Sequence, residues 1–177
     1  PSSKVQASEG QAACVDCRDG TISSGGAREC SACPVGAFCT SGASEPEPCA
    51  AGRFGDATNQ TSAQCVGPCA AGHWCEAGST NATAAACGKG AFNPSEGAAS
   101  ADACQPCSAG SAAAEEGSAS CEPCAGGSFV ITPGAVKCGP CPLGHHCAEG
   151  SVQPMPCDAG SLGGRANLTS QGECSAC

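Results

Sequence analysis

The sequence has too few large apolar side chains to build a conventional hydrophobic core. Leu, Ile, Val and Phe together account for 16 of the 177 residues, tyrosine is absent, and Trp and Met occur once each. That share lies well below the ~20% under which burial of apolar area rarely offsets chain entropy. Most of the nominally hydrophobic 41% is alanine and cysteine, which bury little area per side chain. Something other than a core must therefore stabilise the fold.

Positive charge and long apolar runs are also scarce. Lys and Arg number 7 against 16 Asp and Glu, a net charge of −9, which disfavours binding to nucleic acid or to anionic membrane surfaces. No apolar run approaches the ~18–20 residues of a membrane span, and no signal-peptide pattern occurs at the start. We therefore expect no nucleic-acid partner and no direct membrane insertion. The missing initiator Met suggests a processed product or a fragment of a longer protein.

Cysteine, in contrast, is abundant and regularly spaced. The chain has 20 cysteines. Nine of them open a motif Cys-x-x-Gly-x-Φ, in which Φ is usually large and apolar; these opening cysteines are Cys17, Cys33, Cys49, Cys69, Cys87, Cys107, Cys124, Cys141 and Cys157. Disulfides typically contribute ~2–4 kcal/mol each by constraining the unfolded chain, and they persist in oxidising compartments. The composition predicts a disulfide scaffold in an extracellular protein, secreted or on a cell surface.

The residues within each motif predict turns and short strand pairs. The Gly suits a tight turn with positive φ, and the Φ side chain two residues later can cover a disulfide. Proline precedes six of the opening cysteines and fixes φ there. The alanine runs are too short to nucleate a helix alone. We predict a small disulfide-rich fold of irregular structure and short β-ribbons, with almost no helix, arranged as an elongated linear array.

A longer period divides the chain into repeats. Cys33, Cys69, Cys107, Cys141 and Cys177 are separated by 34 to 38 residues, a spacing typical of arrays in which each unit mainly contacts its neighbours. The predicted organisation is a partial cysteine-rich unit over 14–32, repeats over 33–68, 69–106, 107–140 (a variant that lacks the early closing cysteine) and 141–176, and the start of a further unit at 177.

Parity of the cysteines suggests a pairing of each opening cysteine with the next cysteine. Cys14 and Cys177 are left over and would belong to units outside this segment. The main rival is first-to-third and second-to-fourth pairing inside the four-cysteine units, because connectivity does not follow from sequence alone. The proposed pairs are Cys17–Cys30, Cys33–Cys39, Cys49–Cys65, Cys69–Cys75, Cys87–Cys104, Cys107–Cys121, Cys124–Cys138, Cys141–Cys147 and Cys157–Cys174.

Zinc is the alternative role for these cysteines. Cys14-x-x-Cys17 with Cys30-x-x-Cys33, and Cys104-x-x-Cys107 with Cys121-x-x-Cys124, have zinc-ribbon spacing. The further cysteines between these pairs do not fit into sets of four zinc ligands, so we favour disulfides. We expect no metal or other cofactor. His145 and His146 are adjacent, but no third ligand is evident.

The run Cys30-x-x-Cys33-Pro-x-Gly-x-Phe-Cys39, followed by Pro48-Cys49-x-x-Gly-x-Phe54 and Cys65, resembles the ephrin-receptor-like cysteine-rich repeat. It is more distantly similar to the cysteine-rich modules of tumour necrosis factor receptors. The likeness extends from Cys14 to Cys177, and it implies a module of receptor ectodomains or of very large surface proteins. The Ala-, Gly- and Ser-rich filler looks like green-algal surface proteins, including the proteins of flagellar hairs (mastigonemes).

Three sequons predict N-glycosylation at Asn59, Asn81 and Asn167, each in the variable stretch ahead of a later cysteine. Pro46, Pro48, Pro154 and Pro156 are candidates for hydroxylation and O-glycosylation if the source is algal. No Ser/His/Asp arrangement or carboxylate pair in a cleft can be argued, so we do not expect an enzyme.

The sequence thus predicts a structural segment of a large extracellular glycoprotein that forms or decorates a filament or a surface coat. Its expected partners are copies of itself or other filament or coat proteins, with glycans attached. The alternative is a ligand-binding or spacer stalk of a receptor ectodomain. That role needs an exposed aromatic patch, for which the 3% of aromatic residues leaves little material.

Overall fold

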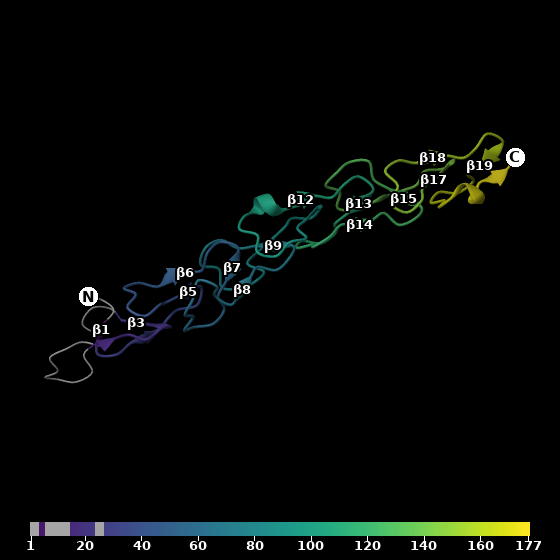
Figure 1. The fold of residues 1–177 in the computed structure, drawn as a ribbon. Coiled ribbons are helices and arrows are strands. Elements are labelled where there is room, and N and C mark those ends of the chain that lie inside the picture. Colours follow the sequence, from purple (N-terminus) through teal and green to yellow (C-terminus); the bar gives the residue numbers. More distant parts are fainter. Residues whose placement is uncertain (1–3, 6–14, 24–26) are drawn as a thin grey trace. The chain divides into compact units, whose positions relative to one another are not determined.

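The computed structural model describes residues 4–5, 15–23 and 27–177 (Figure 1). Within these ranges the regular structure consists of two-residue strands, paired two by two, and two single-turn 3-10 helices. The predicted small disulfide-rich fold of short β-ribbons is confirmed. No helix in the described part of the chain has the length and apolar character needed to cross a membrane.

The chain divides into two compact bodies. The first comprises Pro1–Ala85 and Ser95–Ala103, and the second comprises Ala86–Pro94 and Cys104–Cys177. The first contains β1 (Lys4–Val5), β2 (Val15–Asp16), β3 (Thr21–Ile22), β4 (Ser31–Ala32), β5 (Ala37–Phe38), β6 (Glu47–Pro48), β7 (Arg53–Phe54), β8 (Gly67–Pro68), β9 (His73–Trp74) and the 3-10 helix η1 (Ala101–Ala103).

The strand β10 (Ala85–Ala86) lies where the chain passes from the first body to the second. The second body contains the remaining elements. They are β11 (Ala91–Phe92), β12 (Gln105–Pro106), β13 (Ser111–Ala112), β14 (Glu122–Pro123), β15 (Ser128–Phe129), β16 (Gly139–Pro140), β17 (His145–His146), β18 (Met155–Pro156), β19 (Ser161–Leu162), the 3-10 helix η2 (Gln171–Glu173) and β20 (Ser175–Ala176).

Each ribbon is built from the cysteine motif. We call the stretch from one opening cysteine to the next a half-repeat. Its fourth and fifth residues after the opening cysteine pair antiparallel with its last two residues, as in Ala37↔Pro48 and Phe38↔Glu47. The amide of Cys49 then donates to the Gly36 carbonyl at 2.8 Å. Since strand amides alternate in direction, proline ahead of an opening cysteine removes no hydrogen bond of the ladder.

Two positions have left-handed backbone in every half-repeat from Cys33 onward; in the half-repeat that opens at Cys17, only the first of them is found among the described residues. The first is the motif glycine three residues after the opening cysteine, here called the turn glycine. The second, called the loop residue, lies nine or ten residues after the opening cysteine. The turn glycines are Gly20, Gly36, Gly52, Gly72, Gly90, Gly110, Gly127, Gly144 and Gly160, and the loop residues are Gly42, Asn59, Gly78, Gly97, Gly117, Gly134, Gly150 and Asn167.

The loop residue joins consecutive half-repeats in the first body. The amide of Gly97 donates to the carbonyl of Cys69, the opening cysteine of the preceding half-repeat, at 2.8 Å. The next carbonyl, that of Ala98, accepts from the amide of Cys75 at 3.0 Å. We call this pair of hydrogen bonds the loop clamp. Each clamp satisfies backbone groups of a chain that has few regular ladders to bond them.

The same clamp recurs along both bodies. In the first, Asn59 donates to Cys33 and Gly78 donates to Cys49, at 3.0 and 2.8 Å. In the second, the corresponding amide-to-carbonyl pairs are Gly117 to Cys87, Gly134 to Cys107, Gly150 to Cys124 and Asn167 to Cys141, at 2.8 to 3.0 Å. Neighbour-to-neighbour contact, expected from the repeat period, is therefore made mainly by backbone hydrogen bonds.

The loop residue also reaches the half-repeat before that one. A Cβ atom placed on Gly20 would lie 2.6 Å from the carbonyl oxygen of Asn59, and one placed on Gly127 would lie 2.5 Å from that of Asn167. A Cβ on Gly52 would overlap the carbonyl of Gly97 in the same way. Within each body, half-repeats thus contact the next one and the next but one, which is a longer reach than the repeat period predicts.

The buried interior consists mostly of disulfides. Ile22, at the Φ position, packs against a cluster formed by Cys33, Ala37 and Cys39 of the following half-repeat. The Ile22 side chain therefore covers the next disulfide along, Cys33–Cys39. Leu162 departs from the expectation that Φ side chains are internal, because it is 60% exposed.

Substitution of turn glycines tests this packing. Gly52→Ala should destabilise its ribbon by more than the ~1–2 kcal/mol of a left-handed backbone, because its Cβ also meets a carbonyl. Gly160→Ala has a similar positive φ but open space around the Cβ, so it should lower the free energy of unfolding only by the ~1–2 kcal/mol of the left-handed backbone. Gly164→Ala has neither feature and should stay within about 0.5 kcal/mol. Amide hydrogen exchange of each variant measures these free energies; equal effects at Gly52 and Gly160 would contradict the predicted contact.

Candidate functional sites on the cysteine framework

Nine disulfides join the described cysteines, with Cα–Cα distances of 5.5 to 6.1 Å. All nine pair an opening cysteine with the next cysteine in the chain. In the four-cysteine repeat over 33–68, for instance, the bonds are Cys33–Cys39 and Cys49–Cys65 rather than first-to-third pairs. Every cross-link therefore closes a local loop of 6 to 17 residues. None of these disulfides joins two half-repeats, so the clamps do that.

The two cysteines of a disulfide differ in burial. Opening cysteines from Cys17 to Cys141 are almost completely buried, whereas the late closing cysteines such as Cys65 and Cys104 are half-exposed. Cys177 carries an exposed free thiol, and its amide donates to the Gly160 carbonyl as an opening cysteine does. Cys14, the other cysteine left over by parity, lies outside the described residues.

The cysteines with zinc-ribbon spacing belong to separate disulfides. Cys104, Cys107 and Cys124 are bonded to Cys87, Cys121 and Cys138, respectively. Cys17 and Cys33 are likewise bonded, to Cys30 and Cys39. In the described ranges no three His, Cys, Asp or Glu side chains gather as metal ligands. His145 turns its Nδ1 toward the Leu143 carbonyl at 3.0 Å, while His146 is half-buried in β17.

Two of the three predicted glycosylation sites coincide with loop residues. Asn59 and Asn167 have φ of 61° and 63° and stand where most other half-repeats have glycine. Asparagine tolerates this region better than other side chains because of its local hydrogen bonding. Both residues are exposed while their backbone is fixed by the clamp. A glycan at either position would leave from the outside of a loop that fastens two half-repeats together.

The third site, Asn81, has a different conformation. Its Oδ1 accepts a hydrogen bond from the Thr83 amide at 2.9 Å and from the Thr83 hydroxyl at 3.4 Å. These bonds form an Asx turn inside the sequon and leave Nδ2, the atom to which a glycan would be attached, outside the turn. Asn81 is exposed, as the loop position of all three sequons predicts.

A small polar network surrounds the sequon of Asn167. The Glu173 carboxylate accepts from the Thr169 amide at 3.1 Å and from its hydroxyl at 3.0 Å, and Arg165 lies 3.3 Å away. The hydrogen bonds from Thr169, with a smaller contribution from Arg165, hold the pKa of the Glu173 carboxyl below its usual value. The arrangement fixes the end of the loop against η2.

The proline candidates lie on accessible parts of the ribbons. Pro46, Pro48 and Pro156 are exposed and Pro154 is half-buried. Pro48 and Pro156 are the last residues of β6 and β18, immediately before an opening cysteine. Their rings are therefore open to modification at the junction of two half-repeats.

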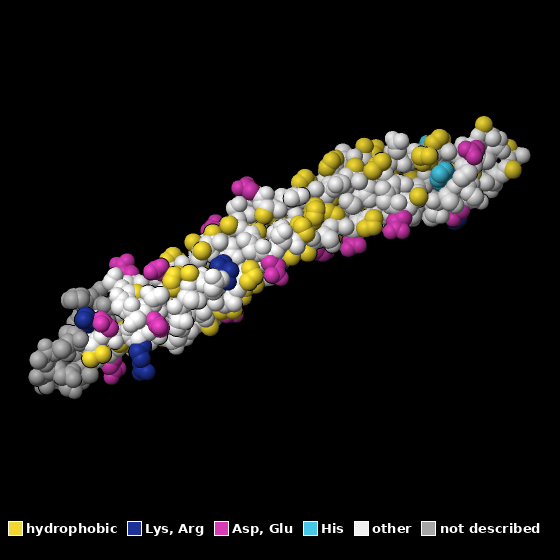
Figure 2. All heavy atoms as spheres, in the orientation of Figure 1, with side chains coloured by type: hydrophobic (Ala, Val, Ile, Leu, Met, Phe, Trp, Pro, Cys, Tyr) yellow, Lys and Arg dark blue, Asp and Glu magenta, His cyan; other side chains and the backbone are white. Residues whose placement is uncertain are grey.

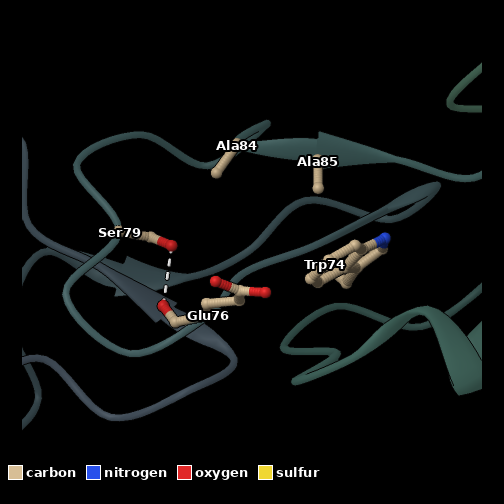
Figure 3. Close-up of a pocket in the computed structure, with 5 residues that line it drawn as sticks. All are labelled: Trp74, Glu76, Ser79, Ala84 and Ala85. Carbon is tan, nitrogen blue, oxygen red and sulfur yellow. Dashed lines mark hydrogen bonds between the residues drawn. The ribbon is translucent and has the colours of Figure 1, made fainter.

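A shallow hollow of about 250 Å³ lies in the first body, beside the only tryptophan of the chain. Its lining residues are Trp74, Glu76, Ser79, Ala84 and Ala85. Figure 3 shows the Trp74 ring on one side, Ala85 of β10 and the preceding Ala84 on the facing segment, and the Glu76 carboxylate turned toward the ring. The Ser79 hydroxyl donates to the Glu76 carbonyl at 2.7 Å. Sequence reasoning assigned Trp74 to an internal Φ position and did not find this hollow.

Charged side chains are dispersed over the surface. On the face drawn in Figure 2, acidic groups are scattered along both bodies and do not gather into one large patch. The ion pairs Lys4–Asp16 and Arg165–Glu173, at 3.4 and 3.3 Å, are exposed and contribute little. The second body also exposes large apolar side chains, namely Ile131, Val136, Leu143, Val152, Met155 and Leu162. These side chains are available for contact with another protein.

Compared with known protein families and with curated proteins, the chain matches none. Its cysteine-rich repeat architecture is thus established by the sequence period, the disulfides and the clamps. The abundance of disulfides indicates an oxidising environment.

The disulfide set makes a chemical prediction. Peptide mapping without reduction should recover the nine pairs given above and no first-to-third pair, because in each case the bonded Cα atoms already lie at disulfide distance. Intact mass should show two hydrogens lost per bond. Recovery of Cys33 linked to Cys49, or of stoichiometric zinc, would refute this assignment.

The Glu173 network predicts a local pH dependence. Because the folded pKa of Glu173 is lowered, its carboxylate stabilises the loop above the unfolded pKa, and this stabilisation is lost as the pH falls through the folded value. Titration by NMR should show the Thr169 amide resonance moving with that lowered pKa. Glu173→Gln should abolish the shift, and Glu149, which is exposed and for which no such bonds are found, offers a matched control through Glu149→Gln. A normal carboxyl titration at Glu173 would contradict the network.

Proposed function

We propose that this chain is a structural segment of a larger extracellular glycoprotein that forms or decorates a filament or a cell or flagellar surface coat. The observation that carries the proposal is the combination of two kinds of connection. Disulfides close the loops locally, and from Asn59 onward clamps fasten the loops to the half-repeat before. A chain held in this way resists extension at each step along its length.

The surface is consistent with a coat or filament role. Aromatic side chains, which supply most protein-binding hot spots, lie mainly at half-buried Φ positions. All three sequons and most of the candidate prolines are accessible for sugars. Oxidation of the cysteines and attachment of N-glycans both belong to the secretory route.

One observation supports a protein partner both in the filament role and in the receptor-stalk alternative. The large apolar side chains exposed in the second body, among them Ile131, Leu143 and Leu162, are more than 40% accessible. Such residues suit a protein contact. In a filament or coat they would meet a copy of the chain or a neighbouring subunit; in a receptor they would meet a ligand. Electron microscopy of the native assembly separates the two: isolated membrane-tethered molecules would defeat the filament proposal.

Pulling on single molecules tests the mechanical role. The disulfides enclose loops of 6 to 17 residues whose ends lie about 6 Å apart. Reduction before pulling should release on the order of 300 Å of contour length, at ~3.5 Å per residue. The oxidised chain should show only small steps as clamps open. Equal extension with and without reductant would contradict the proposal.

Two double variants give a matched internal control. Removing the Cys49–Cys65 disulfide through Cys49→Ser and Cys65→Ser frees a loop of 16 residues, and should add roughly 50 Å to the contour length of the oxidised chain. Removing Cys33–Cys39 in the same way frees a loop of 6 residues, and should add only roughly 15 Å. Identical gains in contour length for the two double variants would show that the disulfide-closed loops do not limit the extension of the chain.

A further inference from the structure

We propose that the hollow beside Trp74 seats the first sugar of an N-linked glycan carried by Asn81. The inference rests on the glycoprotein character proposed above and adds to it a specific sugar-binding surface. The occupant is an N-acetylhexosamine joined to the Asn81 Nδ2, and the surface is the indole of Trp74 with its surrounding side chains.

The hollow has the chemistry of a sugar seat. It is open to solvent, about 250 Å³ in volume, and has one aromatic wall. The π face of an indole is electron-rich, so it attracts the weakly positive C–H face of a pyranose ring. Small side chains opposite, Ala84 and Ala85, leave room for such a ring (Figure 3). The Glu76 carboxylate is exposed and accepts hydrogen bonds only, which suits sugar hydroxyl groups.

Asn81 belongs to the loop whose two ends line this hollow. It lies between Ser79 and Ala84, which both line the hollow, and its Cα is at most ~8 Å from that of Ser79. Its carbonyl oxygen lies 3.5 Å from the Sγ of Cys75, the residue after Trp74. The adjacent Ala82 carbonyl accepts from the Ala70 amide at 2.9 Å. Two contacts therefore hold the sequon loop against the disulfide ring that carries Trp74.

The Asx turn favours attachment at this position. Both hydrogen bonds from Thr83 end on the Oδ1 of Asn81, at 2.9 and 3.4 Å. The Oδ1 side of the amide is thus directed at the loop itself, and the side-chain nitrogen is the end left to carry a substituent. Asn59 and Asn167 lack this turn among their recorded hydrogen bonds, and no residue of their sequons lines the hollow. Their glycans serve as internal controls.

The single tryptophan makes the proposal measurable. Any change in tryptophan emission reports on Trp74 alone. The chain should be produced in a secretory host that attaches N-glycans and, for comparison, in a bacterial periplasm, which oxidises thiols without adding them. A sugar stacked on one face of the indole should lower acrylamide quenching about twofold in the glycosylated protein. Glycopeptide mass spectrometry gives the occupancy at each sequon.

Two variants assign the effect. Asn81→Gln should remove the difference in quenching between the two hosts. Thr61→Ala deletes the sequon of Asn59 but leaves the left-handed asparagine in place, and should preserve the difference. Because each variant is compared with itself across hosts, any change that the substitution makes to the fold cancels. Protons of the first sugar at Asn81 should also move upfield through the ring current of Trp74.

Each outcome decides the proposal. An occupied Asn81 with unchanged quenching overturns the sugar seat, as does an unoccupied Asn81 alongside occupied Asn59 and Asn167. Both results leave the glycoprotein proposal standing. Bare asparagines at all three sequons in the glycosylating host would overturn the sugar seat and the glycoprotein character together. Lower quenching that depends on Asn81 and not on Thr61 supports the seat.

Discussion

The hydrogen bond from a left-handed loop residue to the carbonyl of the preceding opening cysteine is the interaction on which the rest of the structure depends. The disulfides stabilise each loop, but in the described residues they connect nothing beyond it. The clamp, represented by Gly97 to Cys69 and by Asn167 to Cys141, joins these rings, and turn-glycine amides such as that of Gly52, which donates to the Cys75 carbonyl, add a second bond between half-repeats. The turn glycines complete the arrangement, because only a residue without Cβ lets the loop carbonyl approach so closely.

This arrangement explains how a chain with so little apolar surface folds. Backbone groups are satisfied between half-repeats, each bond contributing ~0.5–1.5 kcal/mol, and each disulfide limits the entropy of the unfolded chain. Buried sulfur atoms take the place of a core: opening cysteines such as Cys49 and Cys69 are completely inaccessible to solvent. Side chains are then free to be small, acidic or glycosylated, which suits an exposed structural role.

Much of the local structure follows from the sequence, because it is encoded within one motif. The turn at Gly36, the ribbon that ends at Pro48 and the pairing of Cys33 with Cys39 all lie within 16 residues of one another. The clamp was not predicted. The loop residue that makes the clamp lies nine or ten positions after the opening cysteine. In a chain with 26 glycines, no residue next to Gly97 distinguishes it from the other glycines. The recurrence of Gly or Asn at that offset was the available signal.

The central claim is that consecutive half-repeats are joined by these backbone bonds. Through-hydrogen-bond scalar couplings between an amide nitrogen and the carbonyl carbon that accepts its proton test it most directly. We predict couplings from Asn59 to Cys33, from Gly97 to Cys69 and from Gly134 to Cys107 in the oxidised protein. Their absence, with the disulfides intact and the ribbon couplings from Cys49 to Gly36 present, would contradict the account.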